Sequence, residues 1–350
     1  MNASLESIPL PTPLRPAAAP ASVVDAAPRE GILEVPGGMA LHHGGSLPAV
    51  HIAWRLVGPA NAPVVCALGG ISAHRRVCCE DRRLGWWSEI VGTGEAIDTG
   101  HYRVLSFDYL GGSGESTGPS PGEAFPSISS YDQAEALVRL LNHLGIKSLR
   151  AIAGGSYGGM VALAFGERYP ERVSRIVVIG AADRAHPLST AWRSVQRRVV
   201  RFAITQGNGR DGLELARALA MTTYRSSEEF DARFAGPAQR DAEDRFVFPV
   251  EEYLFARGRD YSSRYVPEAL LCLSKSIDLH HVEAARICVP VTAVAIREDR
   301  LVPLADMRAL VARLPEGRLH EISSLFGHDA FLKESDQLRD IFATALGGAA

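Results

Sequence analysis

The sequence predicts an α/β protein: a mostly parallel sheet flanked by helices, with a helical cap inserted into it. Three observations lead to this expectation. Short apolar runs alternate with helical patterns along much of the chain, which is typical of parallel strands joined by helices. One such run is followed at once by a glycine-rich turn and a helical pattern. The alternation then stops over residues 185–286, where helical patterns dominate and no buried strand is evident.

The elements follow in order along the chain. Residues 1–35 are rich in Pro and Ala without periodicity, and we expect a flexible tail there. Residues 36–184 and 287–350 form the expected core, and residues 185–286 the cap. Apolar runs predict strands at 51–56, 62–68, 102–107, 149–153, 173–179, 289–296 and 319–322. Helical spacing predicts core helices at 131–144, 159–169, 303–314 and 335–346, and cap helices at 192–204 and 212–221.

Composition excludes several classes of function. Among 350 residues the net charge is −3 and no basic stripe stands out, so we expect no nucleic-acid surface. The densest basic cluster, residues 193–201 (RSVQRRVVR), is interpreted as one exposed helix face. No apolar run is long enough to span a membrane and no secretory leader is evident. Five scattered cysteines show neither a disulfide framework nor zinc spacing, so we expect free thiols, no metal and a cytoplasmic location: Cys66, Cys78, Cys79, Cys272 and Cys288.

The most informative motif is the pentapeptide at residues 154–158, GGSYG. It lies between a predicted strand and a predicted helix, the context in which a G-x-S-x-G turn presents a nucleophilic serine. Glycines are needed there because Cβ atoms would clash with the strand and the helix. The pattern therefore predicts Ser156 as a nucleophile exposed at the edge of the sheet.

A serine hydroxyl needs a histidine base and a carboxylate that orients the base. In this arrangement the chain order is serine, acid, histidine. Asp299 follows the predicted strand 289–296, and His328 follows the last predicted strand, after a glycine. Glu298 is an alternative acid, although we favour Asp299. Most other histidines are interpreted as surface or structural residues. His74 could approach the site but precedes the serine in the chain, and His280 with His281, which has no partner at metal-ligand spacing, is interpreted as structural.

A second glycine-rich segment follows the predicted strand 62–68. Gly69 and Gly70 leave that strand at the same edge of the sheet as Ser156. A backbone N–H near Gly69, together with the N–H of Tyr157, would form an oxyanion hole for the tetrahedral intermediate of acyl transfer.

Several motifs together resemble the homoserine O-acetyltransferase family, an acyl-CoA-dependent branch of the α/β-hydrolase fold. The resemblance extends over about residues 42–346. The matching motifs are GWW at 85–87, IDT at 97–99, STGP at 116–119, GSYGG at 155–159, YPERV at 169–173, GLELAR at 212–217, TYRS at 223–226 and GHDAF at 327–331.

The resemblance implies transfer of an acyl group from CoA to the hydroxyl of L-homoserine, in methionine synthesis, with no bound cofactor. Ser156 would accept the acyl group, while Arg217 would bind the carboxylate of homoserine and Asp329 its ammonium group. Succinyl-using relatives often carry an arginine where this chain has Leu301, so the acetyl group is favoured and the succinyl group stays possible. L-serine as the acceptor and simple ester hydrolysis also stay open. The resemblance further implies a homodimer formed through the cap.

The chain departs from the usual family pattern around the expected acyl pocket. Tyr157 stands where a methionine is common, LGG at 68–70 replaces LTG, and DYLGG at 108–112 differs from the usual Asn-x-Leu-Gly. These differences bear on the acyl donor more than on the mechanism.

Overall fold

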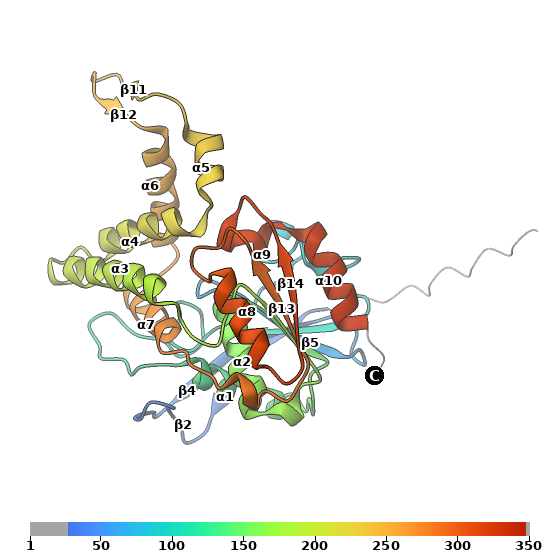
Figure 1. Ribbon diagram of the computed structural model, residues 1–350. Helices are drawn as coiled ribbons and strands as arrows, with labels where there is room; N and C mark the ends of the chain where they lie inside the picture. The colour runs from blue at the N-terminus through green and yellow to red at the C-terminus, as the bar shows by residue number, and fades with distance from the viewer. Residues whose placement is uncertain (1–26, 348–350) are drawn as a thin grey trace, which may run out of the picture.

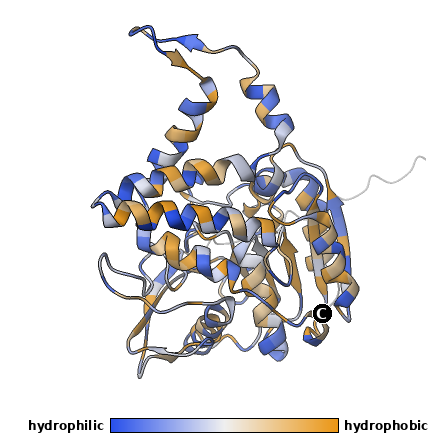
Figure 2. Ribbon diagram, turned by 60° about the vertical axis from the view of Figure 1, so that its left-hand side comes forward, coloured by the Kyte–Doolittle hydropathy of each residue, from blue (hydrophilic) through white to orange (hydrophobic). Residues whose placement is uncertain are grey.

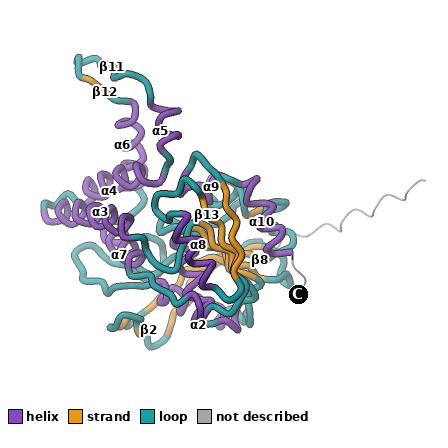
Figure 3. Tube along the Cα trace, in the orientation of Figure 1, coloured by secondary structure: helices purple, strands orange, loops and turns teal. Residues whose placement is uncertain are grey.

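An eight-stranded sheet runs through the centre of the protein, whose computed structural model describes residues 27–347 (Figures 1 and 3). The strand order is β1-β4-β8-β5-β9-β10-β13-β14. The first two pairings, β1 with β4 and β4 with β8, are antiparallel, and all the others are parallel. The strands are β1 (Arg29–Val35), β4 (Val50–Val57), β5 (Val64–Leu68), β8 (Arg103–Phe107), β9 (Ala151–Gly155), β10 (Ile176–Ile179), β13 (Val291–Ile296) and β14 (Gly317–Ile322).

Helices cover both faces of this sheet. The central strands are buried on both sides, because successive side chains of a strand point to opposite faces. Val178 packs into one core with α1 (Ser130–His143), α2 (Tyr157–Arg168) and α8 (Leu304–Arg313), whereas its neighbour Val177 packs into the other with α9 (Ala330–Lys333) and α10 (Ser335–Gly347). The described chain also has short elements: β2 (Met39–Ala40), β3 (Ser46–Leu47), β6 (Val91–Gly92), β7 (Ile97–Asp98), η1 (Arg82–Leu84), η2 (Pro170–Arg172), η3 (Ala284–Arg286) and η4 (Gly327–Asp329).

The cap segment, residues 185–286, leaves the sheet after β10 and returns before β13. It forms α3 (Pro187–Thr205), α4 (Gly209–Tyr224), α5 (Ser227–Phe234), β11 (Gln239–Arg240), β12 (Phe246–Val247), α6 (Pro249–Ser262) and α7 (Pro267–Asp278). Helices α3, α4 and α7 pack on one another beside the sheet, while α5, the β11–β12 hairpin and the start of α6 project outward as an arm (Figure 1). Apolar positions recur along this arm (Figure 2), and Phe246, Phe248 and Phe255 are exposed.

The structure corrects one boundary. The tail was expected to reach residue 35, but Arg29–Val35 form β1, which pairs along its whole length with β4. Its side chains are mostly exposed, so the segment lacks the apolar signal of the inner strands. The rest of the tail prediction, residues 1–26, lies outside the described residues. Among residues 27–347, none of the helices has the length and apolarity that crossing a membrane would require.

Candidate active site

Ser156 occupies the turn between β9 and α2, with backbone angles φ 54° and ψ −123°. This left-handed conformation is costly for a residue with a side chain, and such strain is typical of functional sites. The neighbouring glycines are required because a larger residue would clash with nearby backbone atoms. A Cβ at Gly154 would lie 2.3 Å from the carbonyl oxygen of Gly158, and one at Gly158 would lie 2.5 Å from the backbone of Leu68. The turn therefore has the geometry that the G-x-S-x-G motif predicts.

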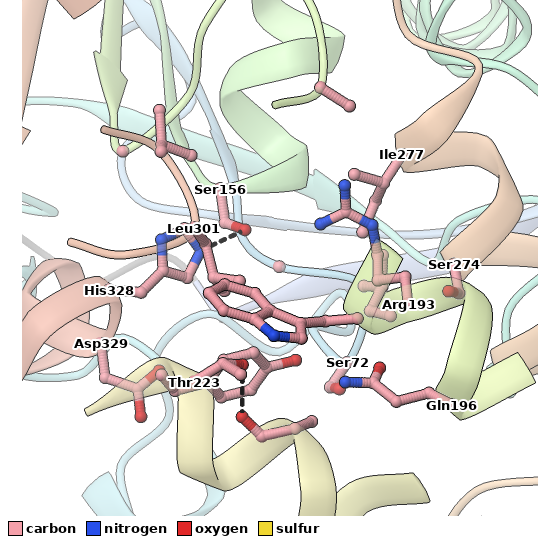
Figure 4. A pocket seen from close by; sticks show the side chains of 18 of the residues that line it. Ser72, Ser156, Arg193, Gln196, Thr223, Ser274, Ile277, Leu301, His328 and Asp329 are labelled. Atoms are coloured by element: carbon pink, nitrogen blue, oxygen red, sulfur yellow. Dashed lines mark hydrogen bonds between the residues drawn. The ribbon is translucent and has the colours of Figure 1, made fainter. Parts of the chain in front are cut away.

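A continuous hydrogen-bonded chain joins the three predicted residues. The Nε2 of His328 lies 2.8 Å from the Oγ of Ser156 (Figure 4), and its Nδ1 lies 2.7 Å from the Oδ2 of Asp299. The other carboxylate oxygen of Asp299 accepts the backbone N–H groups of Leu301 and Val302, at 2.8 and 3.0 Å. Asp299 and His328 are both buried. The base is thus held in one orientation by a carboxylate that is itself fixed.

The environment of His328 adjusts its basicity. Burial acts to lower the pKa of His328, but the charge of Asp299 and its hydrogen bond outweigh burial, so the pKa is raised above its usual value. The positive charge of Arg193 acts in the same direction as burial. An imidazole in this setting can accept the proton of a serine hydroxyl and hold it next to a carboxylate.

The adjacent acid, Glu298, binds the loop that follows β14 instead of the imidazole. Its carboxylate accepts hydrogen bonds from the hydroxyl of Ser323 and from the backbone N–H of Ser324, the latter at 2.8 Å. Of the two acids at the end of β13, the structure therefore brings Asp299 to the imidazole. His280, the expected structural histidine, is buried with its ring against the hydroxyl of Ser130 and the carbonyl oxygen of Ala182, and burial lowers its pKa to about 3.

The turn after β9 and the loop after β5 both present backbone near Ser156, where an oxyanion hole is expected. Tyr157 is the first residue of α2, a position where the N–H has no acceptor within the helix. The carbonyl oxygen of Gly69 accepts the N–H of Gly158 and the hydroxyl of Tyr109, both at 2.8 Å. In a trans peptide the N–H points away from the carbonyl oxygen, so the N–H of Gly70 points away from Gly158 and Tyr109, and Gly70 lines the pocket. The oxyanion donor near Gly69 stays a prediction, with Gly70 as its neighbouring candidate.

A pocket opens over Ser156 between the sheet edge and the cap. Arg217, on α4, lines it together with Tyr224 and Tyr261. The guanidinium of Arg217 lies between these two rings, 5.1 and 4.8 Å from their centroids. Burial acts to lower the pKa of Arg217, but the phenols and Asp329 outweigh it and the pKa is raised. The side chain is thus a permanent cation, held in place by aromatic faces.

Asp329 follows His328 directly and lines the same pocket. Its Oδ2 lies 3.2 Å from the Nε of Arg225, which also pairs with Glu229 at 3.1 Å. Burial raises the pKa of Asp329, against the lowering effect of Arg225 and Arg217. Leu301, the position expected to influence acyl choice, is buried and also lines the pocket. Of the predicted site residues, Ser156, Arg217, Leu301, His328 and Asp329 line this pocket, and Asp299 is joined to it through its hydrogen bond with His328.

The interpretation of residues 193–201 as one exposed helix face is wrong for two arginines. Arg193 and Arg197 lie one turn apart on α3, and both pair with Asp278 at the end of α7, at 2.7 and 2.6 Å. Arg198 and Arg201 are exposed, as expected. The partner carboxylate lies about 80 residues away in the sequence, so local spacing carried no signal of this burial.

Sequence reasoning also assigned no role to several residues that shape the site. Arg225 and Tyr224 lie within the TYRS motif and Trp87 within GWW, but the motifs do not say what these side chains touch. Trp87 donates its indole N–H to the carbonyl oxygen of Phe331 at 2.7 Å, which fixes the segment that follows His328. Tyr261, on α6, had no signal at all, because only the folded cap brings it to Arg217.

Comparison with known proteins agrees with this geometry. Residues 63–335 match the family model of the alpha/beta hydrolase fold. The crystal structure of esterase E22 superposes with a TM-score of 0.82 over 91% of this chain and all of the other, at 19% identity, which is a likeness of fold. The site and the fold therefore place the chain among the α/β hydrolases.

Two curated relatives narrow this class. The homoserine O-succinyltransferase of Xanthomonas campestris pv. campestris is 43% identical, over 85% of this chain and 79% of its own. The homoserine O-acetyltransferase of Symbiobacterium thermophilum is 37% identical, over 78% of this chain and 81% of its own. The chain belongs to the homoserine O-acyltransferase family, as its motifs predict.

Proposed function

We propose that the protein transfers an acyl group from a CoA thioester to the hydroxyl of L-homoserine, a step that would serve methionine synthesis. The observation that carries the proposal is the joint lining of one pocket by Ser156 with His328, Arg217 and Asp329. A nucleophile with its base can perform acyl transfer in general. A cation and a carboxylate beside them match the two charged groups of an amino acid.

The first half-reaction would proceed as follows. His328 takes the proton of Ser156 while the Oγ attacks the thioester carbonyl. The developing oxyanion accepts the N–H groups of Tyr157 and Gly70, each such donor being worth about 3 kcal/mol of barrier. The intermediate then collapses with cleavage of the C–S bond, and His328 protonates the departing thiolate of CoA. The acyl group is left as an ester on Ser156.

The second half-reaction uses the amino-acid site. The carboxylate of homoserine binds the guanidinium of Arg217, whose planar donors suit a bidentate contact. Its ammonium group pairs with Asp329, next to the catalytic base. The hydroxyl then lies toward His328, which takes its proton as the oxygen attacks the acyl ester, and Ser156 regains its proton. Positioning of the acceptor would favour homoserine over water as the second nucleophile.

Release of free CoA thiol tests the proposal. We expect steady release from an acyl-CoA only when homoserine is added, with O-acylhomoserine as the product and no activity in Ser156→Ala. Equal release without an acceptor would indicate an ester or thioester hydrolase, and a preference for L-serine would change the acceptor. No release from any acyl-CoA would contradict the proposal.

We also propose a homodimer formed through the cap, in a reducing compartment such as the cytoplasm. The arm of α5, β11–β12 and α6 exposes Phe246, Phe248 and Phe255, an apolar surface that a monomer would leave in water. The symmetric partner is a second copy of the same arm. The free thiols are consistent with the compartment.

A further inference from the structure

The pocket contains a second positively charged side chain that homoserine does not use. Arg193, on α3, lines the pocket with Ser156, and only 12% of its side chain is exposed. In the view of Figure 4 it lies across the pocket from His328, with Ser156 between them. Its charge reaches the imidazole, as its effect on the pKa of His328 indicates. Arg184 also lines the pocket but is exposed, so water solvates its charge.

The ion pairs around Arg193 leave one positive charge uncompensated. Asp278 lies 2.8 Å from the Nε of Arg193 and 2.6 Å from the Nη1 of Arg197, so one carboxylate faces two guanidinium groups. Arg197 also donates to the carbonyl and hydroxyl oxygens of Ser274, at 3.0 Å each. The Nη2 of Arg193 is buried 2.7 Å from the Oδ1 of Asp278, so this side of the guanidinium is already taken by the shared carboxylate. An anion that enters the pocket would compensate the remaining positive charge of the two arginines.

The position of Arg193 follows from the way α3 is attached to the loop after Asp299. The hydroxyl of Ser189 donates to the carbonyl oxygen of Leu301 at 2.7 Å. Arg193 comes one helical turn after Ser189, on the same side of α3. Helix α3 therefore brings a guanidinium into the pocket that Leu301 also lines, where the loop itself supplies only an apolar side chain.

We propose that Arg193 binds the distal carboxylate of a dicarboxylic acyl group, so that the donor is a succinyl thioester. This inference rests on the proposed function and deepens it. An acetyl group has no charge for Arg193 to bind, and the single carboxylate of homoserine is assigned to Arg217. The succinyl group provides the second anion, and the absence of an arginine at position 301 no longer favours acetyl.

The chemistry at Ser156 is unchanged by this choice. Its Oγ forms an ester bond with the thioester carbonyl carbon while the C–S bond breaks, and His328 gives the CoA thiolate its proton. The succinyl ester keeps its free carboxylate on Arg193 until the oxygen of homoserine replaces Ser156. Arg193 touches none of the reacting atoms and acts as a specificity residue.

The test compares succinyl-CoA with butyryl-CoA, which has the same carbon chain but a methyl group in place of the carboxylate, and with acetyl-CoA. For the wild type we expect kcat/KM with succinyl-CoA to exceed that with butyryl-CoA by about 10- to 100-fold, the usual worth of a hydrogen bond to a charged group. Arg193→Met should remove this preference and leave acetyl-CoA within about threefold. Arg198→Met deletes the same charge from an exposed position of α3 and should change nothing.

Either of two results would overturn the inference: wild-type protein that prefers acetyl-CoA or does not separate succinyl from butyryl, or an Arg193→Met variant that loses all donors equally. The wild-type comparison needs no variant, so it stands even where Arg193→Met fails to fold. Arg193→Lys keeps the charge and should retain part of the preference. If no thioester releases CoA at all, the proposed function itself fails, which is a different result from a poor response to succinyl-CoA alone.

Discussion

Replacement of Arg217 by Met should separate the two halves of the reaction. In the structure its guanidinium lies between the rings of Tyr224 and Tyr261, in the pocket beside Ser156. A bidentate contact with the carboxylate of homoserine makes two charge-assisted hydrogen bonds of about 1.5–3 kcal/mol each. Loss of both would lower kcat/KM for homoserine by roughly 10²- to 10⁴-fold. Acylation of Ser156 does not involve this contact and should change by less than about threefold.

Rapid-mixing measurement of thiol release can follow both steps. A burst of CoA thiol equal to the enzyme concentration reports acylation, and the steady rate with increasing homoserine reports transfer. Arg210→Met, at the exposed start of the same helix, is the matched control and should behave as the wild type. The reasoning would be refuted by an Arg217→Met variant that turns over homoserine normally, or by one whose burst is lost along with its steady rate.

Three further changes have defined outcomes. Asp299→Asn removes the charge that raises the pKa of His328, so the rate of acyl transfer should fall by roughly 10³- to 10⁴-fold. The acidic limb of the pH–rate profile, where the imidazole becomes protonated, should move to lower pH. An unmoved limb would contradict the assigned cause of the raised pKa. Ser156→Gly removes a backbone strain of about 1–3 kcal/mol that Ser156→Ala keeps. The greater freedom of glycine in the unfolded chain cancels about 0.4–1 kcal/mol of this gain. Urea unfolding should therefore show the Gly variant to be more stable than the Ala variant by about 1 kcal/mol. Phe246→Ser with Phe248→Ser should turn a dimer into a monomer in light scattering, and a wild-type monomer would disprove the proposed cap interface.

The inner sheet and the Ser-His-Asp chain could be predicted because each left a local signal. Apolar runs mark buried parallel strands, and the G-x-S-x-G turn marks a nucleophile that requires an acid and a histidine further along the chain. The sequence could favour Asp299 over Glu298 but not decide between them, since both are carboxylates and differ only in the direction in which the loop points each side chain. The hydrogen bonds of Glu298 to residues 323 and 324 make that direction clear.

Other features depend on contacts between distant segments. Strand β1 was missed because it lies at the edge of the sheet with mostly exposed side chains, so it forms by backbone pairing and carries no apolar pattern in the sequence. The direction of the Gly69–Gly70 peptide, on which the predicted oxyanion donor depends, is set by Gly158 and Tyr109. Arg193 was predicted to lie on an exposed helix face, because its partner Asp278 and the pocket that it lines are brought to it only by the folded chain. Each of these features depends on a partner far away in the sequence.

Intact-protein mass spectrometry tests the central claim most directly. Protein mixed with an acyl-CoA and no acceptor should gain the mass of one acyl group, located on the peptide that contains Ser156. Addition of homoserine should return the protein to its original mass as O-acylhomoserine forms. An acyl group found on any other residue, or a product formed at full rate by Ser156→Ala, would contradict the account.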